Sequence, residues 1–417
     1  MYSSHMLDIS YIREHKEEVK VNNATRNVTV DLDALLLLDS KKVGLQKEIE
    51  VLRAKRNQKS KQKPSPEEIT QMKQVGEQIR VLEQELKPLE AEFFLQLIKI
   101  PNINHPSTPI GKDDTGNVPI RNAGLKIEFG FKPKEHFEVE NIKQYIDMER
   151  GAKVSGSRFY YLKGKLAILE RALMQYAVDF MTSRGFELIL PPVLVKETAM
   201  YGTGFFPADK NEIYTVNPGE DNLFLIGTSE VPLIFMHSDE VLNESELPKK
   251  YVAVTPCFRR ESGSYGKDTK GLFRVHQFYK VEMVVFATPA QSSDLHEQLL
   301  AYEEEFIKSL GLHYQVVNVC SGDLGYPAAK KYDCEGWFAG QGRYRELTST
   351  SNTTDYQARR SNIKIKTKDG QRAFAHTLNG TVSSDRPLLA IIENNQQEDG
   401  SVVVPEVLRK YTGFDKI

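Results

Sequence analysis

The sequence predicts an α+β protein: an N-terminal antiparallel α-helical coiled-coil hairpin, followed by a domain whose mainly antiparallel β-sheet is flanked by helices. Two observations predict this order. Residues 31–99 contain almost no aromatic residues and alternate Lys, Glu, Gln and Leu, a composition that favours long helices. Beyond residue 125, aromatic and β-branched residues become frequent, and the apolar runs follow no regular strand–helix–strand alternation.

The hairpin is predicted from two apolar stripes with heptad-compatible spacing. The first stripe contains Leu35, Leu38, Leu45, Ile49 and Leu52. The second contains Met72, Val75, Ile79, Leu82, Leu86, Leu89 and Phe93. Between the stripes, residues 57–66 hold three lysines and two prolines, which interrupt a helix in a polar turn. Each arm of roughly 30 residues would be about 45 Å long.

Charge is distributed unevenly along this hairpin. The whole chain has 55 Lys plus Arg and 57 Asp plus Glu, a formal net charge of −2, so its overall charge does not indicate a nucleic-acid partner. Residues 40–63, however, carry nine basic and two acidic residues, a balance of +7, whereas residues 64–99 carry four and seven, a balance of −3. A basic helix of this kind suits phosphate contacts, but solvated or paired charges on an ordinary coiled coil explain the same pattern.

The length of 417 residues suits two or three domains. We place a helical hairpin at 1–110 and a large domain at 111–417, and residues 1–5 resemble a cloning remnant before Met6. The three cysteines, Cys257, Cys320 and Cys334, form no Cys-x-x-Cys pair, which argues against a disulfide framework and a zinc site. No apolar run approaches about 18 residues and no signal peptide is recognisable, so we expect a cytoplasmic protein without a membrane span.

The elements of the large domain are predicted from periodicity and composition. Residues 101–125 are rich in proline and glycine and are expected to form the linker. Helical spacing predicts helices over residues 164–184 and 292–310. Apolar and β-branched runs predict strands over residues 186–190, 251–255, 278–286, 314–319 and 388–392.

Several common catalytic and nucleotide-binding motifs are absent. The run most similar to a phosphate-binding P-loop, residues 263–268, lacks the hydroxyl residue that would hold Mg²⁺. There is no Gly-x-Gly-x-x-Gly turn, no Gly-x-Ser-x-Gly elbow and no His-Glu-x-x-His pair. A phosphate site in this protein would therefore be built from side chains.

One candidate site lies in a predicted strand–loop–strand segment. Arg259 and Glu261 end the first strand, residues 262–274 form a glycine-rich basic loop, and Glu282 lies in the returning strand. Because alternate residues of a strand share a face, these three side chains are expected to lie on one face of the sheet. Two carboxylates and an arginine could bind an amine and a phosphate together.

Two further segments carry groups suited to the same chemistry. Glu346 lies three residues before Ser349, and this carboxylate and hydroxyl are hard oxygen ligands of the kind that Mg²⁺ prefers. Residues 376–381 are followed by Arg386 and Glu393. Considered singly, each of these charged residues would more often form a structural ion pair.

Together these segments resemble the class II aminoacyl-tRNA synthetases. Residues 258–261 and 281–283 resemble motif 2 of that class, residues 378–396 resemble motif 3 and residues 186–192 resemble motif 1. The resemblance therefore implies the class II antiparallel sheet for the large domain.

A narrower resemblance, to the seryl-tRNA synthetases of the bacterial type, covers essentially residues 6–417. It is carried by the hairpin and by residues 203–207, 228–230 and 346–360. The chain departs mildly from the family pattern: family members more often have alanine at the position of Ser229 and an aromatic residue at the position of Asn395. Neither change removes a group that the chemistry needs.

The resemblance implies a reaction in two steps. L-Serine and ATP give seryl-adenylate and pyrophosphate, and the seryl group then passes to the 3′ end of tRNA(Ser), and of tRNA(Sec) where the organism has one. Neither step needs a protein nucleophile, so catalysis must come from positioning and charge neutralisation. By resemblance, the catalytic residues are Arg259, Glu282 and Arg386.

The resemblance also implies the binding residues. Arg259 would contact the α-phosphate, Arg386 the γ-phosphate, Phe278 the adenine ring and Glu261 the adenine amino group, within an ATP set of Arg259, Arg260, Glu261, Val275, Phe278, Glu346, Leu347, Thr348, Ser349 and Arg386. Mg²⁺ would bind to Glu346 and Ser349, and no zinc is expected. Glu230 would receive the serine ammonium, and Glu282 and Thr381 its hydroxyl, within a serine set of Thr228, Ser229, Glu230, Arg259, Glu282, Asn379 and Thr381. The tRNA set is Arg53, Lys55, Arg56, Lys59, Lys61, Lys63, Lys267 and Lys270.

Motif 1 implies a homodimer. Two alternatives remain open at this point. One is a synthetase-like paralogue that ligates an amino acid to a carrier protein or serves as a regulatory binding module. The intact hairpin disfavours the carrier-protein ligase, and the complete set of polar site residues disfavours the regulatory module. Another class II synthetase, for threonine or proline, is disfavoured by the hairpin, and threonine also by the lack of an editing domain and zinc ligands.

Overall fold

The structure, a computed structural model, describes residues 7–59, 65–262, 268 and 270–417. The chain divides into two compact units, one ending at Pro101 and the other running from Asn102 to Ile417. The division falls at the start of the Pro- and Gly-rich stretch, nine residues before the boundary expected at residue 110. None of the described helices is both long enough and apolar enough to cross a membrane.

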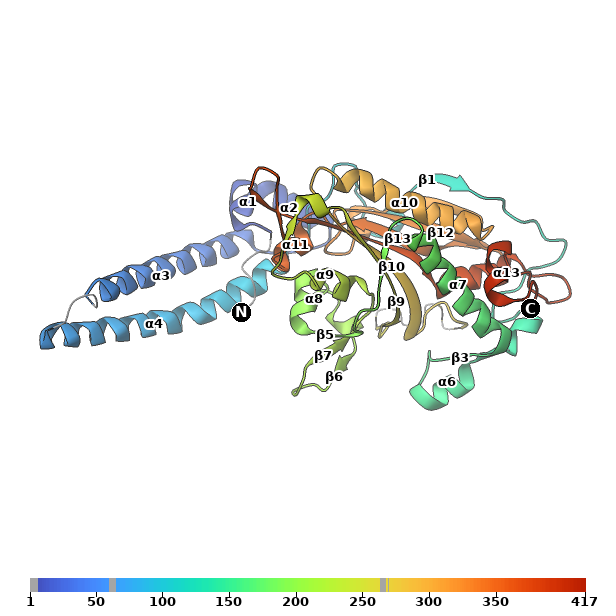
Figure 1. The fold of residues 1–417 in the computed structure, drawn as a ribbon, viewed down its shortest axis with the longest axis horizontal. Helices are drawn as coiled ribbons and strands as arrows, with labels where there is room; N and C mark the ends of the chain where they lie inside the picture. The colour runs from blue at the N-terminus through green and yellow to red at the C-terminus, as the bar shows by residue number, and fades with distance from the viewer. Residues whose placement is uncertain (1–6, 60–64, 263–267, 269) are drawn as a thin grey trace. The chain divides into compact units, whose positions relative to one another are not determined.

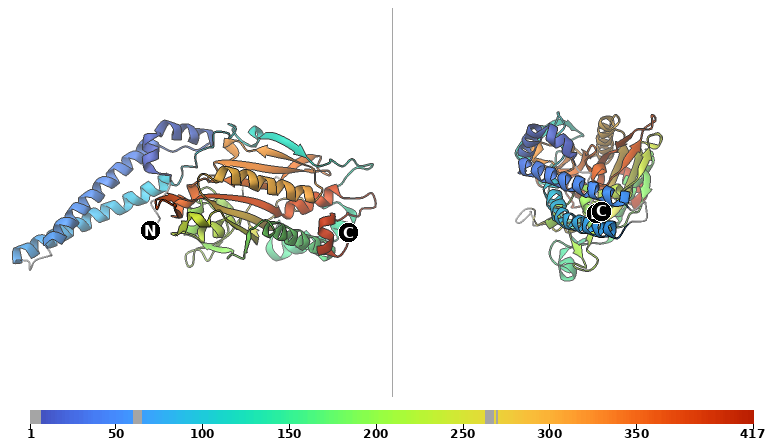
Figure 2. Two further views of the ribbon diagram at one scale, coloured as in Figure 1. Left: turned by 45° about the horizontal axis from the view of Figure 1, so that its top comes forward. Right: turned by 90° about the vertical axis from the view of Figure 1, so that its left-hand side faces the viewer.

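The first unit is helical. Its described elements are α1 (Ile9–Glu14), α2 (Lys16–Thr25), α3 (Leu32–Lys59) and α4 (Pro66–Leu97). Helices α3 and α4 run side by side as an antiparallel pair (Figures 1 and 2), which confirms the predicted hairpin. Helix α4 begins with a capping box, in which the Ser65 hydroxyl accepts from the Glu68 N–H and the Glu68 carboxylate accepts from the Ser65 N–H. Pro66 at the first helical position further favours a helix start here.

Packing between α3 and α4 follows the predicted stripes. Every residue of both stripes is buried or partly buried, with the lowest exposure at Leu35, Ile49, Ile79 and Phe93. Polar pairs flank this apolar seam. Gln46 donates to Glu90 at 3.0 Å, and Arg53 forms an ion pair with Glu83 at 2.7 Å. The hairpin is therefore held by an apolar seam with exposed charged pairs at its margin.

The two short helices before the hairpin are not predicted by sequence periodicity. Asp39 of α3 is only 2% exposed and forms ion pairs with Arg13 of α1 at 2.6 Å and with Lys42 at 2.9 Å. This carboxylate ties α1 to the hairpin. Such short helices depend on tertiary contacts, because a helix of six to ten residues is marginal by itself.

The second unit is built on an eight-stranded sheet with the order β1-β11-β12-β13-β16-β10-β9-β4. Its strands are β1 (Val118–Ala123), β4 (Glu187–Ile189), β9 (Lys249–Phe258), β10 (Gln277–Ala287), β11 (Tyr314–Asn318), β12 (Lys330–Phe338), β13 (Arg343–Asn352) and β16 (His376–Ser384). All neighbours pair antiparallel except β4 and β9, which are parallel. The mainly antiparallel sheet is therefore confirmed.

Helices cover both faces of this sheet (Figures 1 and 2). One face packs against α7 (Gly164–Thr182), α10 (Ser292–Ser309) and α12 (Asp385–Asn394), and buries the main apolar cluster. A second cluster on the other face lies beneath α9 (Glu230–Phe235) and α11 (Tyr356–Arg360). The alternate residues Val284 and Phe286 of β10 belong to this second cluster, whereas the same face nearer the start of β10 carries Phe278, Lys280 and Glu282. One strand therefore leads from the core to a polar site.

Two predictions about the second unit are wrong. Residues 388–392 lie in α12 and not in a strand, although they are fully shielded as a buried segment should be. A short continuous apolar run does not distinguish a buried strand from a buried helix; here the Ser384 N-cap and Pro387 in the first turn favour the helix. Residues 101–125 are not only a linker, because they include edge strand β1, which pairs with β11.

Candidate active site

The candidate site is a cavity at the start of β10, bordered by β13, β16, the N-terminus of α12 and the segment that returns to β10. Its lining residues are Arg259, Glu261, Leu272, Phe273, Arg274, Val275, Phe278, Lys280, Glu346, Leu347, Ser349, Thr381, Ser384, Asp385 and Arg386. Eight residues of the expected ATP set are among them, and the serine set contributes Thr381 and the shared Arg259. The structure therefore brings together groups from four separate segments of the sequence.

A β-bulge places the two expected Mg²⁺ ligands on the same face. Residues three apart in a regular strand point to opposite faces. The pairing of β13 with β12 shifts between Cys334 and Glu335, which leaves Leu347 as an extra residue. The bulge reverses the alternation once, so Glu346 and Ser349 both line the cavity.

A second bulge, in β16, also places two residues that are three apart on the same face of the sheet. Its pairing with β10 shifts between Val281 and Glu282, which leaves Val382 as an extra residue. Thr381 and Ser384, again three residues apart, therefore both line the cavity. Bulges often occur beside active sites, where they redirect a side chain.

Two arginines supply positive charge to the cavity. Arg259 follows the end of β9, with its guanidinium carbon 5.2 Å from the centre of the Phe278 ring and Nη2 3.4 Å from the Gly227 carbonyl oxygen. Arg386 lies in the first turn of α12, where its Nη1 is 3.2 Å from a carboxylate oxygen of Glu346. Planar guanidinium groups are well suited to bind phosphate oxygens.

Glu346 keeps its negative charge in this setting. Burial opposes its ionisation, but Arg386, Lys331 and Arg259 together hold the pKa of Glu346 below its usual value. Its side chain is nevertheless 41% exposed, and with Ser349 it offers a carboxylate and a hydroxyl. Hard oxygen donors of this kind fit Mg²⁺, which usually takes its remaining ligands from water and substrate phosphates. Among the residues that the structure describes, no cluster of three or more His, Cys, Asp or Glu side chains is arranged to hold a metal.

The aromatic side of the cavity is shaped by the segment that returns to β10. Phe273 lies close to two guanidinium groups, with the guanidinium carbon of Arg345 3.4 Å and that of Arg386 4.8 Å from its ring centre. Arg274 forms an ion pair with Glu261 at 3.1 Å. Ring and guanidinium stacking of this type holds flat groups at fixed spacing.

A second group of polar residues lies deeper on the same face of the sheet. Glu282 is 2% exposed, accepts a hydrogen bond from the Thr381 hydroxyl at 3.1 Å and forms an ion pair with Lys280 at 2.5 Å. Both Thr381 and Lys280 also line the cavity. The buried carboxylate of Glu282 is therefore connected through Thr381 and Lys280 to the part of the cavity that the arginines line.

Glu230 adds a second buried carboxyl group at the start of α9. Gln357 of α11 donates to it at 2.7 Å, and its own backbone N–H donates to the Thr228 hydroxyl at 3.2 Å. Burial, and then the negative charge of Glu282, raises the pKa of Glu230 to about 7. The neighbouring Ser229 hydroxyl is fully buried and, among the described residues, has no hydrogen-bond partner.

Some predicted site residues lie elsewhere. Arg260 is exposed and does not line the cavity, and the Thr348 hydroxyl donates to Glu303 of α10 at 2.8 Å, on the face of the sheet opposite the site. Asn379 is buried two residues before Thr381 on β16. Arg259, Glu261 and Glu282 are expected on one face of the sheet, but β9 ends at Phe258, so Arg259 and Glu261 follow the strand and are not part of it. Arg259 and Glu261 line the cavity, and Glu282 contacts the lining residues Thr381 and Lys280.

The predicted tRNA residues are described in part. Arg53 is 53% exposed although paired, and Lys55, Arg56 and Lys270 are exposed. Of the other predicted tRNA residues, Lys61, Lys63 and Lys267 lie outside the described part of the chain, and the side chain of Lys59 is not described.

Sequence reasoning missed several lining residues, including Lys280, Phe273 and Arg274. The alternation of Phe278, Lys280 and Glu282 along β10 could have identified Lys280, because all three share a face. No local pattern identifies Phe273, because it lies in a connecting segment and its position depends on tertiary contacts.

Comparison with known proteins places the chain in a family. The model of the seryl-tRNA synthetase N-terminal domain matches residues 6–104, and that of the tRNA synthetase class II core domain (G, H, P, S and T) matches residues 214–395. A serine–tRNA ligase from Rubrobacter xylanophilus is 43% identical over 421 residues, covering 99% of each chain. The chain belongs to the seryl-tRNA synthetase family.

Solved structures agree with this assignment. The seryl-tRNA synthetase from Pyrococcus horikoshii, complexed with ATP, has a TM-score of 0.89 and 41% identity, covering 99% of each chain. The cytoplasmic serine–tRNA ligase from Naegleria fowleri, in complex with AMP, has a TM-score of 0.85 and 34% identity, again covering 99% of each chain. The predicted family and fold of this chain are therefore confirmed. Full-length similarity to serine–tRNA ligases favours tRNA charging over ligation to a carrier protein.

Proposed function

We propose that this protein binds ATP in the cavity described above, joins its adenylate group to L-serine as seryl-adenylate, and transfers the seryl group to tRNA(Ser). One observation carries the assignment of the site. Thr381 lines the same cavity as Arg259, Glu346 and Arg386, while its hydroxyl donates to Glu282. Groups suited to serine and groups suited to phosphate are thus adjacent, as attack of the serine carboxylate on a phosphate requires.

The first step needs charge neutralisation more than covalent catalysis. A carboxylate oxygen of serine bonds to the α-phosphorus, and the bond between that phosphorus and the bridging oxygen of pyrophosphate breaks. Arg259 is assigned to the α-phosphate and Arg386 to the far end of the triphosphate, where their charges offset the charge that develops in the transition state. Glu346 and Ser349 would hold Mg²⁺, which when bound neutralises phosphate charge.

Recognition of serine is assigned to the deeper part of the site. Glu230 receives the α-ammonium group, while Glu282 and Thr381 bind the side-chain hydroxyl. A site whose buried groups are paired to a substrate hydroxyl strongly rejects an analogue without it, because those groups lose a partner. Alanine should therefore be rejected strongly, whereas threonine must be excluded by the lack of room for its extra methyl group.

The test of this assignment is serine-dependent ATP–pyrophosphate exchange with Glu282→Ala and Glu282→Gln variants. We expect both variants to lose nearly all exchange: in Glu282→Ala the serine hydroxyl loses its buried acceptor, and in Glu282→Gln the acceptor is a neutral amide that no longer offsets the charge of Lys280. Glu282→Ala also leaves Lys280 buried without its partner, so thermal unfolding must show that the variant is folded, and Glu282→Gln preserves the shape. Glu305→Ala, on the exposed side of α10, is the control. Near-normal exchange by either folded Glu282 variant would refute the assignment.

The hairpin is proposed to bind tRNA(Ser), and tRNA(Sec) where the organism makes one. The support is the +7 balance over residues 40–63 and the exposure of Lys55 and Arg56 on α3. A charged rod of this kind contacts phosphates without reading bases.

A cytoplasmic location is also proposed, because the three buried cysteines are free thiols, as is usual in a reducing compartment. We further propose that the protein is a homodimer. Strand β4 lies at one end of the sheet order, and three apolar side chains around it are exposed: Leu188 at 42%, Leu190 at 78% and Leu194 at 38%. Light scattering should give twice the 47.4 kDa chain mass, and Leu190→Asp should shift the protein toward monomer. A monomeric wild-type protein would contradict the proposal.

A further inference from the structure

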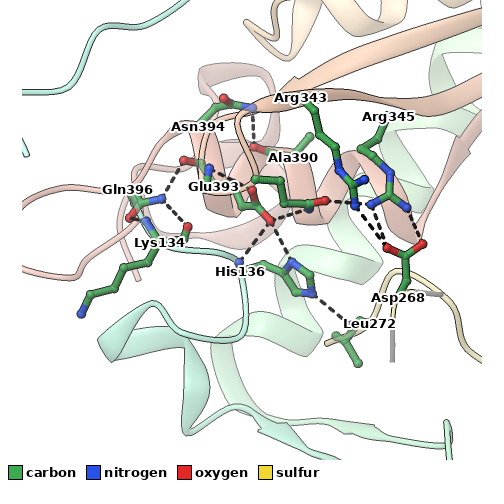
Figure 3. Close-up of polar contacts among 12 residues, drawn as sticks. Lys134, His136, Asp268, Leu272, Arg343, Arg345, Ala390, Glu393, Asn394 and Gln396 are labelled. Atoms are coloured by element: carbon green, nitrogen blue, oxygen red, sulfur yellow. Dashed lines mark hydrogen bonds and ion pairs between the residues drawn. The ribbon is translucent and has the colours of Figure 1, made fainter. Parts of the chain in front are cut away.

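A buried histidine connects helix α12 to the segment that returns to β10. His136 lies in the chain between β1 and α5 (Glu140–Lys143), and its side chain is 1% exposed. Glu393, near the end of α12, is fully buried. Figure 3 shows the two side chains in contact, with Leu272 on the opposite side of the imidazole ring. Neither residue belongs to the site sets that the family resemblance implies.

The hydrogen bonds of His136 determine where its ring proton lies. The backbone N–H of Leu272 donates to Nε2 at 3.0 Å, and because an N–H can only donate, Nε2 must be the unprotonated acceptor. Nδ1 then carries the proton of the neutral ring and donates it to a carboxylate oxygen of Glu393 at 2.9 Å. The imidazole therefore serves as a bridge with one donor and one acceptor.

Glu393 holds this bridge in place through three further hydrogen bonds. Its carboxylate accepts from the backbone N–H of His136 at 3.2 Å, from the N–H of Gly340 at 3.1 Å and from the side chain of Gln341 at 3.1 Å. A buried carboxylate with four donors is fully occupied and has a single favourable position. The imidazole is thus fixed relative to α12.

The backbone on the other side of the ring is adapted to close contact. Gly271 has φ +69°, and a Cβ atom there would lie 2.4 Å from Nε2 of His136. A residue with a side chain would therefore displace the ring or the loop. The imidazole packs directly against the backbone at residues 271–272.

The residues that follow this contact line the cavity. Phe273, Arg274 and Val275 come directly after Leu272, and all three are lining residues. Phe273 packs against the guanidinium groups of Arg345 and Arg386. A shift at Leu272 would therefore change the position of an aromatic ring and of an arginine within the site.

We propose that His136 is a positioning residue for ATP activation: through the Leu272 N–H it fixes residues 272–275 against the nucleotide, and Glu393 fixes His136. The proposal rests on the placement of ATP in the cavity that is proposed above. The contact with residues 272–275 depends directly on the acceptor at Nε2, and the donor at Nδ1 acts only indirectly by orienting the ring, whereas a purely structural role would depend equally on both.

Two substitutions separate these two hydrogen bonds. His136→Asn reaches about as far as Nδ1, so it can still donate to Glu393 but offers no acceptor to Leu272. His136→Gln reaches about as far as Nε2, so it can accept from Leu272 but loses the donor to Glu393. His105→Asn, an exposed histidine that contacts Ser107, is the matched control.

In ATP–pyrophosphate exchange, His136→Asn should raise the KM for ATP by about tenfold, the effect of one lost hydrogen bond of about 1.4 kcal/mol. The KM for serine should stay near the wild-type value. His136→Gln should keep the KM for ATP within about twofold of wild type even if its melting temperature falls, and the control should change neither constant. Equal rises in both His136 variants, or no rise in His136→Asn, would overturn the proposal.

Hydrogen exchange gives an independent readout that does not depend on either variant folding. In the wild-type protein, the Leu272 amide should exchange slowly, and fast exchange there would also overturn the proposal. Arg386→Ala tests the ATP placement separately. If it leaves the KM for ATP unchanged, the placement of ATP fails; if it raises that KM while His136→Asn does not, only the positioning role fails.

Discussion

Glu230 is a carboxyl group whose surroundings oppose its ionisation. Burial and the neighbouring Glu282 raise its pKa to about 7, although the hydrogen bond from Gln357 acts in the opposite direction. Among the described residues, this site contains two buried carboxyl groups and one buried cation, Lys280, which forms an ion pair with Glu282. An incoming ammonium group would supply the missing positive charge, so binding of serine and ionisation of Glu230 should favour each other.

The KM for serine should therefore depend on pH. A carboxyl group with a raised pKa is mostly neutral below that pKa and becomes charged above it. From about pH 6 to pH 7 the KM for serine should fall by several-fold, and above about pH 8 it should level off. ATP–pyrophosphate exchange at saturating ATP measures this. Glu230→Gln, which cannot ionise, should have a high KM for serine without this pH dependence, and an unchanged profile in that variant would exclude Glu230 as the titrating group.

At the scale of elements, helix α3 has charges that its partner helix does not fully pair. Arg53 is bound to Glu83 of α4, whereas Lys55 and Arg56, closer to the C-terminal end of α3, have exposed side chains. Surface ion pairs of this kind contribute little to stability. The unevenly distributed charge therefore has more effect on a phosphate-bearing partner than on the fold of the hairpin.

Substituting both Lys55 and Arg56 by alanine should weaken tRNA binding without affecting serine activation. The KM for tRNA(Ser) should rise, and the slope of log KM against log salt concentration should fall by about 1 to 2, because up to two phosphate contacts are lost. Aminoacylation at several salt concentrations measures the slope. The control is Lys73→Ala on the exposed side of α4. Equal effects of the control and the double variant would mean that α3 has no special role.

At the scale of the whole molecule, the two compact units correspond to two proposed tasks. The unit from Asn102 to Ile417 contains every described residue that lines the candidate site, and the hairpin unit contributes none. Adenylate formation should therefore need only the larger unit, whereas charging of tRNA should need both.

Deleting residues 31–100 should separate these tasks. We expect ATP–pyrophosphate exchange to stay within about threefold of wild type, since no lining residue is lost, and aminoacylation of tRNA(Ser) to fall by two or more orders of magnitude. Both rates should be measured on the same protein sample, with circular dichroism to confirm folding. Unchanged aminoacylation would refute a tRNA-binding role for the hairpin.

The sequence by itself determined the two helices of the hairpin and the strands at 251–255 and 278–286, whereas most of the turn predicted at 57–66 lies outside the described residues. These features depend on local spacing and turn residues, which act over a few residues whatever surrounds them. The family resemblance added most residues of the candidate site. Local spacing did not distinguish helix from strand at residues 388–392, because an apolar run is compatible with either.

Only the tertiary structure decided on which face of the sheet the site residues lie. The spacing of Glu346 and Ser349 would place them on opposite faces of a regular strand, and a bulge paired against β12 reverses this. His136 lies far along the sequence from both Glu393 and Leu272, and their contact depends on the packing of three separate segments. Strand pairing and long-range packing carry no local signal, so these positions could be assigned only once the sheet and its covering segments were in place.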